Sequence, residues 1–416
     1  MTDIEAALDG LRDRGLYRRM RMISGPQGPR VLLDGRPVLL LCSNNYLGLA
    51  DHPRVRESAA DAAMRYGAGA GASRLVSGNM RIHRRLEERL AEFKGYPSAL
   101  LFGSGYLANT GVIQALAKPG EVVFSDALNH ASIVDGCRLA GAETFVYDHA
   151  DMDHLAWGLR QADGRGSLIA TDGVFSMDGD VAPLTEIVEL ARRYDARVMV
   201  DDAHGTGTIG PDGRGAVAAA GLEDEVDVLV GTLGKALGSY GAFVCCDRQM
   251  AKYLVNSART LIFSTALAPP QVAAAMAALE LLREEPRRVE RLQRNARVLR
   301  EALSEQGMPA GGGETPIVPA IVGDADAAVN ASERALERGV FAQAIRPPTV
   351  PAGSSRLRLT VMASHTKTEL REAAKIVAKA IPEEARKAAA RRALDAEGTT
   401  AADAGARVFD GLADAA

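Results

Sequence analysis

The sequence has few cysteines, a single tryptophan and no long apolar run. Its four cysteines include no C-x-x-C pair, and the adjacent Cys245 and Cys246 are awkward disulfide partners. We therefore expect reduced, buried thiols in a cytoplasmic protein, and no metal site. No apolar run approaches the roughly 20 residues that a membrane-spanning helix needs. The first residues, MTDIEAALDGLRDRG, carry acids early and lack the apolar stretch of a signal peptide.

An excess of either charge is also missing. Lysine and arginine together number 49, and aspartate and glutamate number 53, which gives a formal net charge of −4. This balance provides no basic field that would attract nucleic acid or an anionic membrane. Hydrophobic residues make up 47% and charged residues 25% of the chain, which is enough for a large core and unlike a disordered protein. We expect its partner to be a small molecule or a second copy of itself.

Short apolar segments alternate with helical segments through the middle of the chain. The apolar segments are Ala99–Phe102, Val122–Ser125, Ser167–Thr171, Arg197–Asp201, Asp227–Gly231 and Gly241–Cys245. They show no polar alternation, which is typical of a sheet covered on both faces. The alternation of apolar strands and helical segments predicts an α/β fold with a doubly wound, mostly parallel sheet. Ligands of such sheets bind beyond the carboxyl ends of the strands, so we look for chemistry there.

The rest of the chain has a different organisation on either side of this region. A charged amphipathic helix is expected from Met1 to about Arg21, and Asp34-Gly35 indicates a hairpin. A helix-rich stretch runs from about Pro269 to Gln306 and precedes a smaller α+β region. We predict an N-terminal arm with a small-domain segment over 1–48, a large domain over 49–280, a C-terminal α+β domain over 281–381 and an alanine-rich extension over 382–416.

Lys235 is the first candidate for chemistry. It lies just past an apolar strand, between Gly234 and Gly238 in the run GTLGKALGS. A lone lysine is usually a solvated surface group, but these glycines would let a planar ligand approach the backbone. An amine in a partly apolar pocket loses its proton more easily and can form a Schiff base. Thr232, on the same turn, could hydrogen-bond a phosphate.

Asp201 and His204 follow the preceding strand in the run VDDAHG. Pyridoxal 5'-phosphate (PLP) needs a carboxylate beside its ring nitrogen, because that charge keeps the ring protonated and able to accept electrons. His204, three residues further on, would reach the phenolic oxygen of the same ring. A helix-capping aspartate with a structural histidine is the alternative for this run alone. Lys235, which follows the next strand, favours the cofactor site.

Three other strand ends carry polar residues. Ser104, Gly105 and Tyr106 form a turn between a strand and a helix, where free backbone N–H groups could hold the PLP phosphate. His130 follows the next strand and could stack on the pyridine ring, although a structural histidine is equally compatible with the sequence there. Ser176 follows a strand and a turn, well placed to hydrogen-bond the ring substituents.

Three arginines stand apart from the densely charged helices. Arg18 lies near the N-terminus, and Arg346 and Arg356 flank the stiff segment PPTVP. A guanidinium group binds a carboxylate through two parallel hydrogen bonds, so any of them could hold an amino-acid substrate. A surface ion pair is the alternative for each one.

The combination of these motifs resembles the α-oxoamine synthases, which are fold-type I PLP enzymes. The resemblance runs from about Leu8 to Ile381. It is carried by DGVFSMDGDVAPL at 172–184, VMVDDAHGTGTIG at 198–210 and AIRPPTVPAGSSRLRLT at 344–360. It implies a large domain with a mostly parallel seven-stranded sheet, helices on both faces, and a smaller α+β C-terminal domain.

The resemblance also assigns roles to individual residues. The implied catalytic and cofactor-binding residues are Lys235, Asp201, His204, His130, Ser104, Gly105, Tyr106, Ser176 and Thr232. Ser264 and Thr265 match phosphate contacts that the neighbouring subunit supplies, which implies a homodimer with shared active sites. The implied substrate contacts are Arg18, Asn44, His130, Thr349 and Arg356.

The activity that the resemblance implies is a decarboxylative condensation of an amino acid with an acyl thioester. The segment RPPTVP favours the biotin-pathway member of the family, whose substrates are L-alanine and pimeloyl-CoA or a pimeloyl carrier protein. Lys235 would then take the α-proton and Arg356 would hold the carboxylate. His130 would polarise the thioester carbonyl, and Arg18 would meet the far end of the acyl group. The alternatives are a glycine C-acetyltransferase, a fold-type I aminotransferase and a non-catalytic PLP-binding protein.

Overall fold

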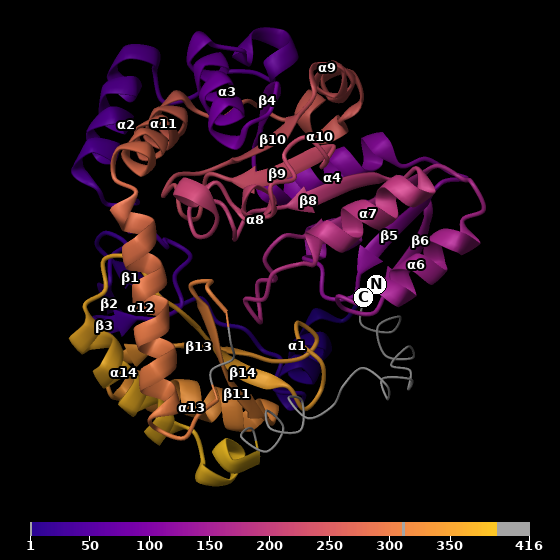
Figure 1. The fold of residues 1–416 in the computed structure, drawn as a ribbon. Coiled ribbons are helices and arrows are strands. Elements are labelled where there is room, and N and C mark those ends of the chain that lie inside the picture. The colour runs from indigo at the N-terminus through magenta and orange to yellow at the C-terminus, as the bar shows by residue number, and fades with distance from the viewer. Residues whose placement is uncertain (1, 310–312, 389–416) are drawn as a thin grey trace.

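A seven-stranded sheet in the order β4-β10-β9-β8-β7-β5-β6 forms the larger lobe of the molecule (Figure 1). The structure, a computed structural model, describes residues 2–309 and 313–388. The strands are β4 Ser98–Phe102, β5 Val122–Asp126, β6 Glu143–Tyr147, β7 Ser167–Asp172, β8 Arg197–Asp201, β9 Val228–Thr232 and β10 Ala242–Cys246. Only the pairs that involve β10 are antiparallel. The sheet is therefore mostly parallel, as the sequence predicts.

Helices cover both faces of this sheet. In β7, Leu168 and Ala170 belong to one apolar core and Ile169 belongs to the other. The first core includes side chains of α4, α5, α9 and α10, and the second includes those of α3, α6, α7 and α11. The helices of this lobe are α2 Pro53–Tyr66, α3 Arg81–Lys94, α4 Gly105–Leu116, α5 Ala131–Ala140, α6 Met152–Gln161, α7 Leu184–Tyr194, α8 Ala216–Ala220, α9 Arg248–Ser257, α10 Arg259–Ile262 and α11 Pro269–Glu284. Strands that are buried on both sides need unbroken apolar runs, which is why these strands are visible in the sequence.

The smaller lobe contains two short sheets and is linked to the larger one by α12 Arg287–Ser304 (Figure 1). One sheet is antiparallel in the order β11-β14-β13, and the other has the order β1-β2-β3-β12. Its elements are α1 Ile4–Asp13, β1 Ile23–Ser24, β2 Arg30–Leu33, β3 Arg36–Leu40, β11 Ile317–Gly323, α13 Ala325–Glu337, β12 Val340–Phe341, β13 Gln343–Ile345, β14 Ser355–Thr360 and α14 Lys367–Ala380. In β2 and β3, Leu33 pairs with Arg36, which confirms the predicted hairpin at Asp34-Gly35.

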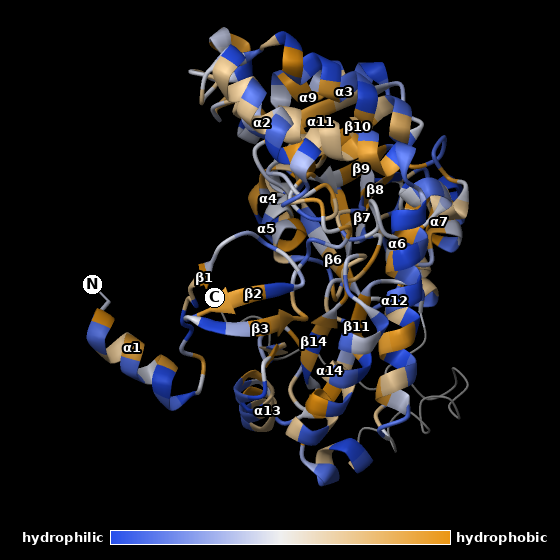
Figure 2. Cartoon of the chain, turned by 90° about the vertical axis from the view of Figure 1, so that its left-hand side faces the viewer, coloured by the Kyte–Doolittle hydropathy of each residue, from blue (hydrophilic) through white to orange (hydrophobic). Residues whose placement is uncertain are grey.

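Two segments differ from the expectations. The N-terminal helix ends at Asp13 rather than near Arg21, because the chain turns at Gly15 with φ of +65°. This helix buries no side chain, and it lies apart from the body of the molecule in Figure 2. Strand β6 has no counterpart in the sequence-based prediction. It is an edge strand whose first residues, Glu143 and Thr144, are exposed, so its apolar run is short.

The sequence also predicts domain limits and a C-terminal extension. The predicted division at residues 48, 280 and 381 stays a prediction. Residues 389–416 of the predicted alanine-rich extension lie outside the described residues. Within the described part of the chain, no helix combines the length and apolar character needed to cross a membrane.

Candidate active site

Lys235 lies on a tight turn between β9 and β10. Gly238, on the same turn, has φ of +59°, and a Cβ there would come within 2.4 Å of the backbone nitrogen of Ala50. Glycine is therefore needed for the turn to pack against the segment before α2. The turn directs Lys235 inward, so that its Nζ lies 2.7 Å from Nε2 of His204. The ends of β8 and β9 thus bring these two candidate residues together.

The environment of Lys235 makes its amine easier to deprotonate. Burial lowers the pKa of Lys235 to about 8, although the nearby carboxylates of Asp201 and Asp172 act in the opposite direction. About a tenth of the amine is therefore neutral at pH 7, far more than for an exposed lysine. A neutral amine is the form that can attack a carbonyl group or accept a proton.

A chain of polar side chains extends from His204 to the smaller lobe. Nδ1 of His204 lies 2.7 Å from the hydroxyl of Tyr46, which donates to Oδ1 of Asn44 at 3.1 Å. The guanidinium group of Arg358 donates to the same two oxygens, at 3.4 Å and 3.3 Å. Burial first, and then the positive charges of Lys235 and Arg358, hold the pKa of His204 well below its usual range. His204 is therefore a neutral imidazole.

Asp201 ends β8 and accepts hydrogen bonds from uncharged groups. Nδ2 of Asn109 donates to Oδ2 at 2.6 Å, and the backbone of Ala203 donates to Oδ1 at 2.9 Å. Asn109 also donates to the hydroxyl of Ser132 at 2.8 Å, and this hydroxyl lies 2.7 Å from Nδ1 of His130. A single network therefore joins the predicted ring partners Asp201 and His130. No sequence motif marks Asn109 or Ser132 as a candidate functional residue.

Asp172 is a second buried acid in this cluster. It ends β7, and its Oδ2 accepts a hydrogen bond from the backbone of His130 at 2.9 Å. Burial and the charge of Asp201 raise the pKa of Asp172 well above its usual range. Burial lowers the pKa of His130, while Asp201 raises it and Lys235 lowers it. Asp172 therefore fixes the backbone at His130, and its raised pKa favours the neutral form of the acid.

The predicted phosphate turn has the expected local form. Ser104 caps α4, and its hydroxyl accepts a hydrogen bond from the backbone of Leu107 at 3.2 Å. A Cβ at Gly105 would have no neighbour within 4 Å, so the space beside the first turn of α4 is open. Thr232 ends β9, and its hydroxyl accepts a hydrogen bond from the backbone of Gly234 at 3.2 Å. Backbone N–H groups at a helix start and two hydroxyls form a suitable set of donors for a phosphate.

Three further residues, Tyr106, Ser264 and Thr265, are also predicted to contact the phosphate. The hydroxyl of Tyr106 donates to Asp135, and its ring is 44% exposed. Ser264 and Thr265 line a narrow pocket with Gly103, next to the phosphate turn of the same chain.

Ser176 and Arg356 lie where the two lobes meet. The backbone carbonyl of Ser176 accepts a hydrogen bond from Nε of Arg358. Arg356 pairs with the carboxylate of Asp178 and donates to the carbonyl of Ser354 at 2.9 Å. Arg356 and Arg358 are both buried on the same face of β14. Of the two, Arg358 is the one whose contacts lead to His204, although nothing in the sequence distinguishes it as a candidate.

Arg18 and Thr349 lie further from this cluster. Both are exposed, and neither contacts the network around Lys235 in the part of the chain that the structure describes. The backbone of Thr349 donates to the carbonyl of Arg346 at 3.1 Å. Arg346 in turn donates to the backbone carbonyls of Gly15 and Tyr17. Arg346 therefore ties the N-terminal segment that carries Arg18 to the loop that carries Thr349.

These residues suit a cofactor with an aldehyde, an aromatic ring nitrogen and a phosphate. Lys235 supplies a reactive amine, Asp201 a carboxylate, and the start of α4 a phosphate cradle. Oδ1 of Asn109 is buried and has no hydrogen-bond partner among the described residues. A buried polar atom without a partner is costly unless a ligand or water meets it. The donor set fits PLP.

Comparisons with known proteins agree with this geometry. The model of the family described as "aminotransferase class I and II" matches residues 36–377 of the chain. The chain is 54% identical over 373 residues to an 8-amino-7-oxononanoate synthase of Citrifermentans bemidjiense, covering 89% of this chain and 96% of that one. It is 53% identical over 379 residues to that of Geobacter sulfurreducens, covering 90% and 97%.

Solved structures of related enzymes are also similar to this chain. A serine palmitoyltransferase of Sphingomonas wittichii superposes with a TM-score of 0.87 at 32% identity, covering 92% of this chain and 97% of that one. The 8-amino-7-oxononanoate synthase of Francisella tularensis gives a TM-score of 0.72 at 27% identity, covering 82% and 97%. The chain therefore belongs to the aminotransferase class I and II family, and within it to the α-oxoamine synthases.

Proposed function

We propose that the protein uses PLP to condense L-alanine with a pimeloyl thioester, forming 8-amino-7-oxononanoate, CO2 and the free thiol of the acyl carrier. The observation that carries the proposal is the set of 8-amino-7-oxononanoate synthases that are 50–54% identical over about nine-tenths of the chain. The cluster of Lys235, His204, Asp201 and His130 provides the groups that such chemistry requires. The reaction belongs to biotin biosynthesis.

The same residues define how the cofactor would be held. Asp201 would face the ring nitrogen, His204 the phenolic oxygen, His130 the ring face and Ser176 the ring substituents. The predicted phosphate ligands are Ser104, Gly105, Tyr106 and Thr232, with Ser264 and Thr265 contributed by a second subunit. When bound, PLP supplies an electron sink for the carbanion formed at the α-carbon of the amino acid.

Lys235 is the proposed proton carrier. Its neutral amine would take the α-proton of L-alanine, because its lowered pKa of about 8 leaves it able to accept a proton near neutral pH. The α-carbon then forms a bond to the thioester carbonyl as the carbon–sulfur bond breaks. Loss of the amino-acid carboxylate as CO2 follows, and a proton returned to the α-carbon completes the product. His130 is the candidate for polarising the thioester carbonyl.

Two arginines compete for the carboxylate of L-alanine. Arg356 is the residue expected from the sequence, but it already pairs with the charged Asp178. Arg358 is bound by neutral oxygens, and its contacts with Asn44 and Tyr46 are long, at 3.3 Å and 3.4 Å. A substrate carboxylate displaces neutral partners more readily than an ion pair. We therefore propose that Arg358 receives the carboxylate and that Arg356 holds Asp178 in place.

The acyl donor would enter past the segments that carry Arg18 and Thr349. Arg18 is exposed and would meet the distal carboxylate of the pimeloyl chain, and Thr349 and Asn44 are further proposed substrate contacts. We also propose that the protein works as a cytoplasmic homodimer. The resemblance to the α-oxoamine synthases supports the dimer, because it implies that a second subunit supplies the phosphate contacts of Ser264 and Thr265.

The proposal is tested by mixing the PLP-loaded protein with L-alanine and pimeloyl-CoA and measuring release of CoA and CO2. We expect release that depends on both substrates, and little with glycine and acetyl-CoA or with L-serine and palmitoyl-CoA. A preference for one of those pairs would reassign the substrate within the family. Amino transfer to a 2-oxo acid without CoA release would indicate an aminotransferase instead. Failure to exchange the α-proton of L-alanine with solvent would contradict any catalytic role.

A further inference from the structure

His149 lies outside the cluster around Lys235, yet it contacts segments that lead to two parts of that cluster. It follows β6, and its Nδ1 lies 3.0 Å from Oδ1 of Asp126 while its Nε2 lies 2.9 Å from Oδ2 of Asp180. Phe175 packs edge-on against the imidazole, with ring centroids 4.4 Å apart. The imidazole is therefore held between two carboxylates and a buried aromatic ring.

The first carboxylate leads to His130. Asp126 ends β5 and begins the His130 turn, which we define as residues 126–130. Its Oδ1 also accepts from the backbone of Leu128 at 2.8 Å, and its carbonyl accepts from the backbone of Asn129 at 3.1 Å. The side chain of Asp126 is 2% exposed, so its position is fixed by these bonds. His149 therefore helps to set the turn from which His130 projects.

The second carboxylate leads to Ser176. Asp180 belongs to the Ser176 loop, which we define as residues 173–182. The loop closes on itself, because the carbonyl of Asp180 accepts from the backbone of Phe175 at 2.9 Å. The backbone of Gly173 also donates to the carbonyl of Asp201 at 2.7 Å. The loop that carries Ser176 is thus attached at one end to the Asp201 strand and at the other to His149.

Both contacts of His149 require its charged form. A neutral imidazole has one N–H donor and one acceptor, so it can donate to only one of two carboxylates. Burial lowers the pKa of His149, but the hydrogen bonds and charges of Asp126 and Asp180 outweigh burial and raise it to about 10. The neighbouring Asp148 interacts with His154 instead, at 3.3 Å. The two bonded carboxylates are therefore the charged groups that face His149.

We infer that His149 is a positioning residue that, as an imidazolium, holds the Ser176 loop and the His130 turn in the mutual arrangement that receives the cofactor ring. The inference rests on the proposed function, because it takes Ser176 and His130 as ring contacts. It assigns a role to a side chain that touches neither substrate nor cofactor.

The main test is the affinity of the apo-protein for PLP in a His149→Gln variant. Glutamine carries no charge, and both of its N–H donors are on one nitrogen, so it cannot replace the donors at Nδ1 and Nε2 of the imidazolium. We expect the Kd for PLP to rise about tenfold or more, the size of one lost charge-assisted hydrogen bond. At saturating PLP, kcat should recover more than the Kd does. His154→Gln is the matched control: His154 lies on α6 close by, accepts a hydrogen bond from the backbone of Asp148, packs edge-on against Phe145 and, among the described residues, contacts neither the loop nor the turn. It should bind PLP as the unmodified protein does.

The pH dependence provides a readout that a merely structural residue would not change. In the unmodified protein, PLP affinity should fall as pH rises through about 10, where His149 loses its proton. His149→Gln should lack this step but keep the change near pH 8 that belongs to Lys235. Nitrogen NMR of histidine-labelled protein should also show one of the seven histidines doubly protonated at pH 8.5, and this signal should vanish in the variant.

The outcomes separate the inference from the proposed function. If the unmodified protein binds no PLP, the proposed function fails. If it binds PLP and His149→Gln binds as tightly as His154→Gln, the inference fails. Should His149→Gln not fold, Asp180→Asn removes one carboxylate charge and keeps the side-chain size. The inference then requires weaker PLP binding and a lower pKa for His149, and unchanged values of both would overturn it.

Discussion

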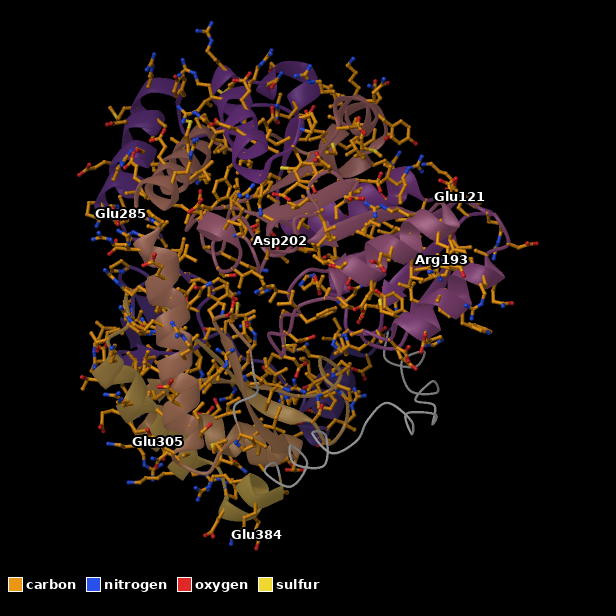
Figure 3. The ribbon with its side chains drawn as sticks, in the orientation of Figure 1. Glu121, Arg193, Asp202, Glu285, Glu305 and Glu384 are labelled. Carbon is orange, nitrogen blue, oxygen red and sulfur yellow. The ribbon has the colours of Figure 1, made fainter. Side chains whose placement is uncertain are left out.

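Replacing Lys94 with methionine should destabilise the protein strongly. Lys94 and Asp202 form an ion pair in which both side chains are 0% exposed. Nζ of Lys94 donates to Oδ2 of Asp202 at 2.7 Å, to the hydroxyl of Thr206 at 2.8 Å and to the carbonyl of Arg214 at 2.6 Å. Asp202 lies in the interior of the molecule, whereas the other residues labelled in Figure 3 lie nearer its periphery.

The magnitude follows from what remains around Asp202. Methionine has a similar length but no charge, so the carboxylate would keep only the hydroxyl of Thr206 at 3.2 Å and the backbone of Ala216 at 2.9 Å. Breaking a buried ion pair by removing one partner costs about 3–5 kcal/mol. At on the order of 2–4 °C per kcal/mol, the melting temperature should fall by roughly 6–20 °C. Thermal unfolding followed by circular dichroism measures this directly.

Two further variants make the prediction refutable. Lys118→Met removes an exposed lysine whose Nζ contacts only a backbone carbonyl, and it should change stability by less than about 0.5 kcal/mol. Adding Asp202→Asn to Lys94→Met removes the unpaired charge, so part of the lost stability should return. If Lys94→Met melted at the same temperature as Lys118→Met, Lys94 would not be compensating Asp202, and the argument from the buried charge would be refuted.

Other predictions concern the reacting groups and one buried histidine. Lys235→Ala should abolish turnover and the absorbance band of the lysine-bound cofactor, and persistence of either would contradict its role. The rate at which apo-protein captures PLP should rise with pH through about 8, where Lys235 loses its proton; a rate that stays flat there would argue against the buried amine. Arg358→Met should raise the KM for L-alanine on the order of 100-fold and more than Arg356→Met does, and the reverse order would return the carboxylate to Arg356. Burial lowers the pKa of His365 to about 4, so the unfolded chain gains a proton first as pH falls below 6.5. His365 should contribute about 2 kcal/mol to the loss of stability between pH 7 and pH 5, and His365→Asn should make that loss smaller by about this amount in thermal melts.

The sequence predicts the centre of this fold well because the strands there are buried on both faces. Strands β5, β7, β8 and β9 have unbroken apolar runs, and the polar residues at their carboxyl ends are brought together as the parallel arrangement requires. Lys235 and His204 meet for this reason. Strand β6 was missed because it lies at an edge and needs no continuous apolar run.

Residues that reach the site through long-range packing could not be predicted in this way. Tyr46 contacts His204 across 158 positions of the chain, and nothing near Tyr46 in the sequence marks the contact. Arg356 and Arg358 share one face of β14, so alternation cannot distinguish them. Their difference comes from the neighbouring Ser176 loop, which presents the carboxylate of Asp178 to one and a carbonyl oxygen to the other. The sequence gives a weak indication of Asn109 as a site residue: it lies in the second turn of the helix that begins at the phosphate turn.

The buried acids around the site explain why Asp201 is the one that suits a cofactor ring. Asp202 is neutralised by Lys94, and Asp126 is bonded to the imidazolium of His149. Burial and a neighbouring charge raise the pKa of Asp172, which favours its neutral form. In the described part of the chain, the hydrogen-bond donors of Asp201 are an amide side chain and a backbone N–H, both uncharged. Its negative charge is therefore not paired with a cationic hydrogen-bond donor among these residues, and a protonated ring nitrogen is the partner that would complete it.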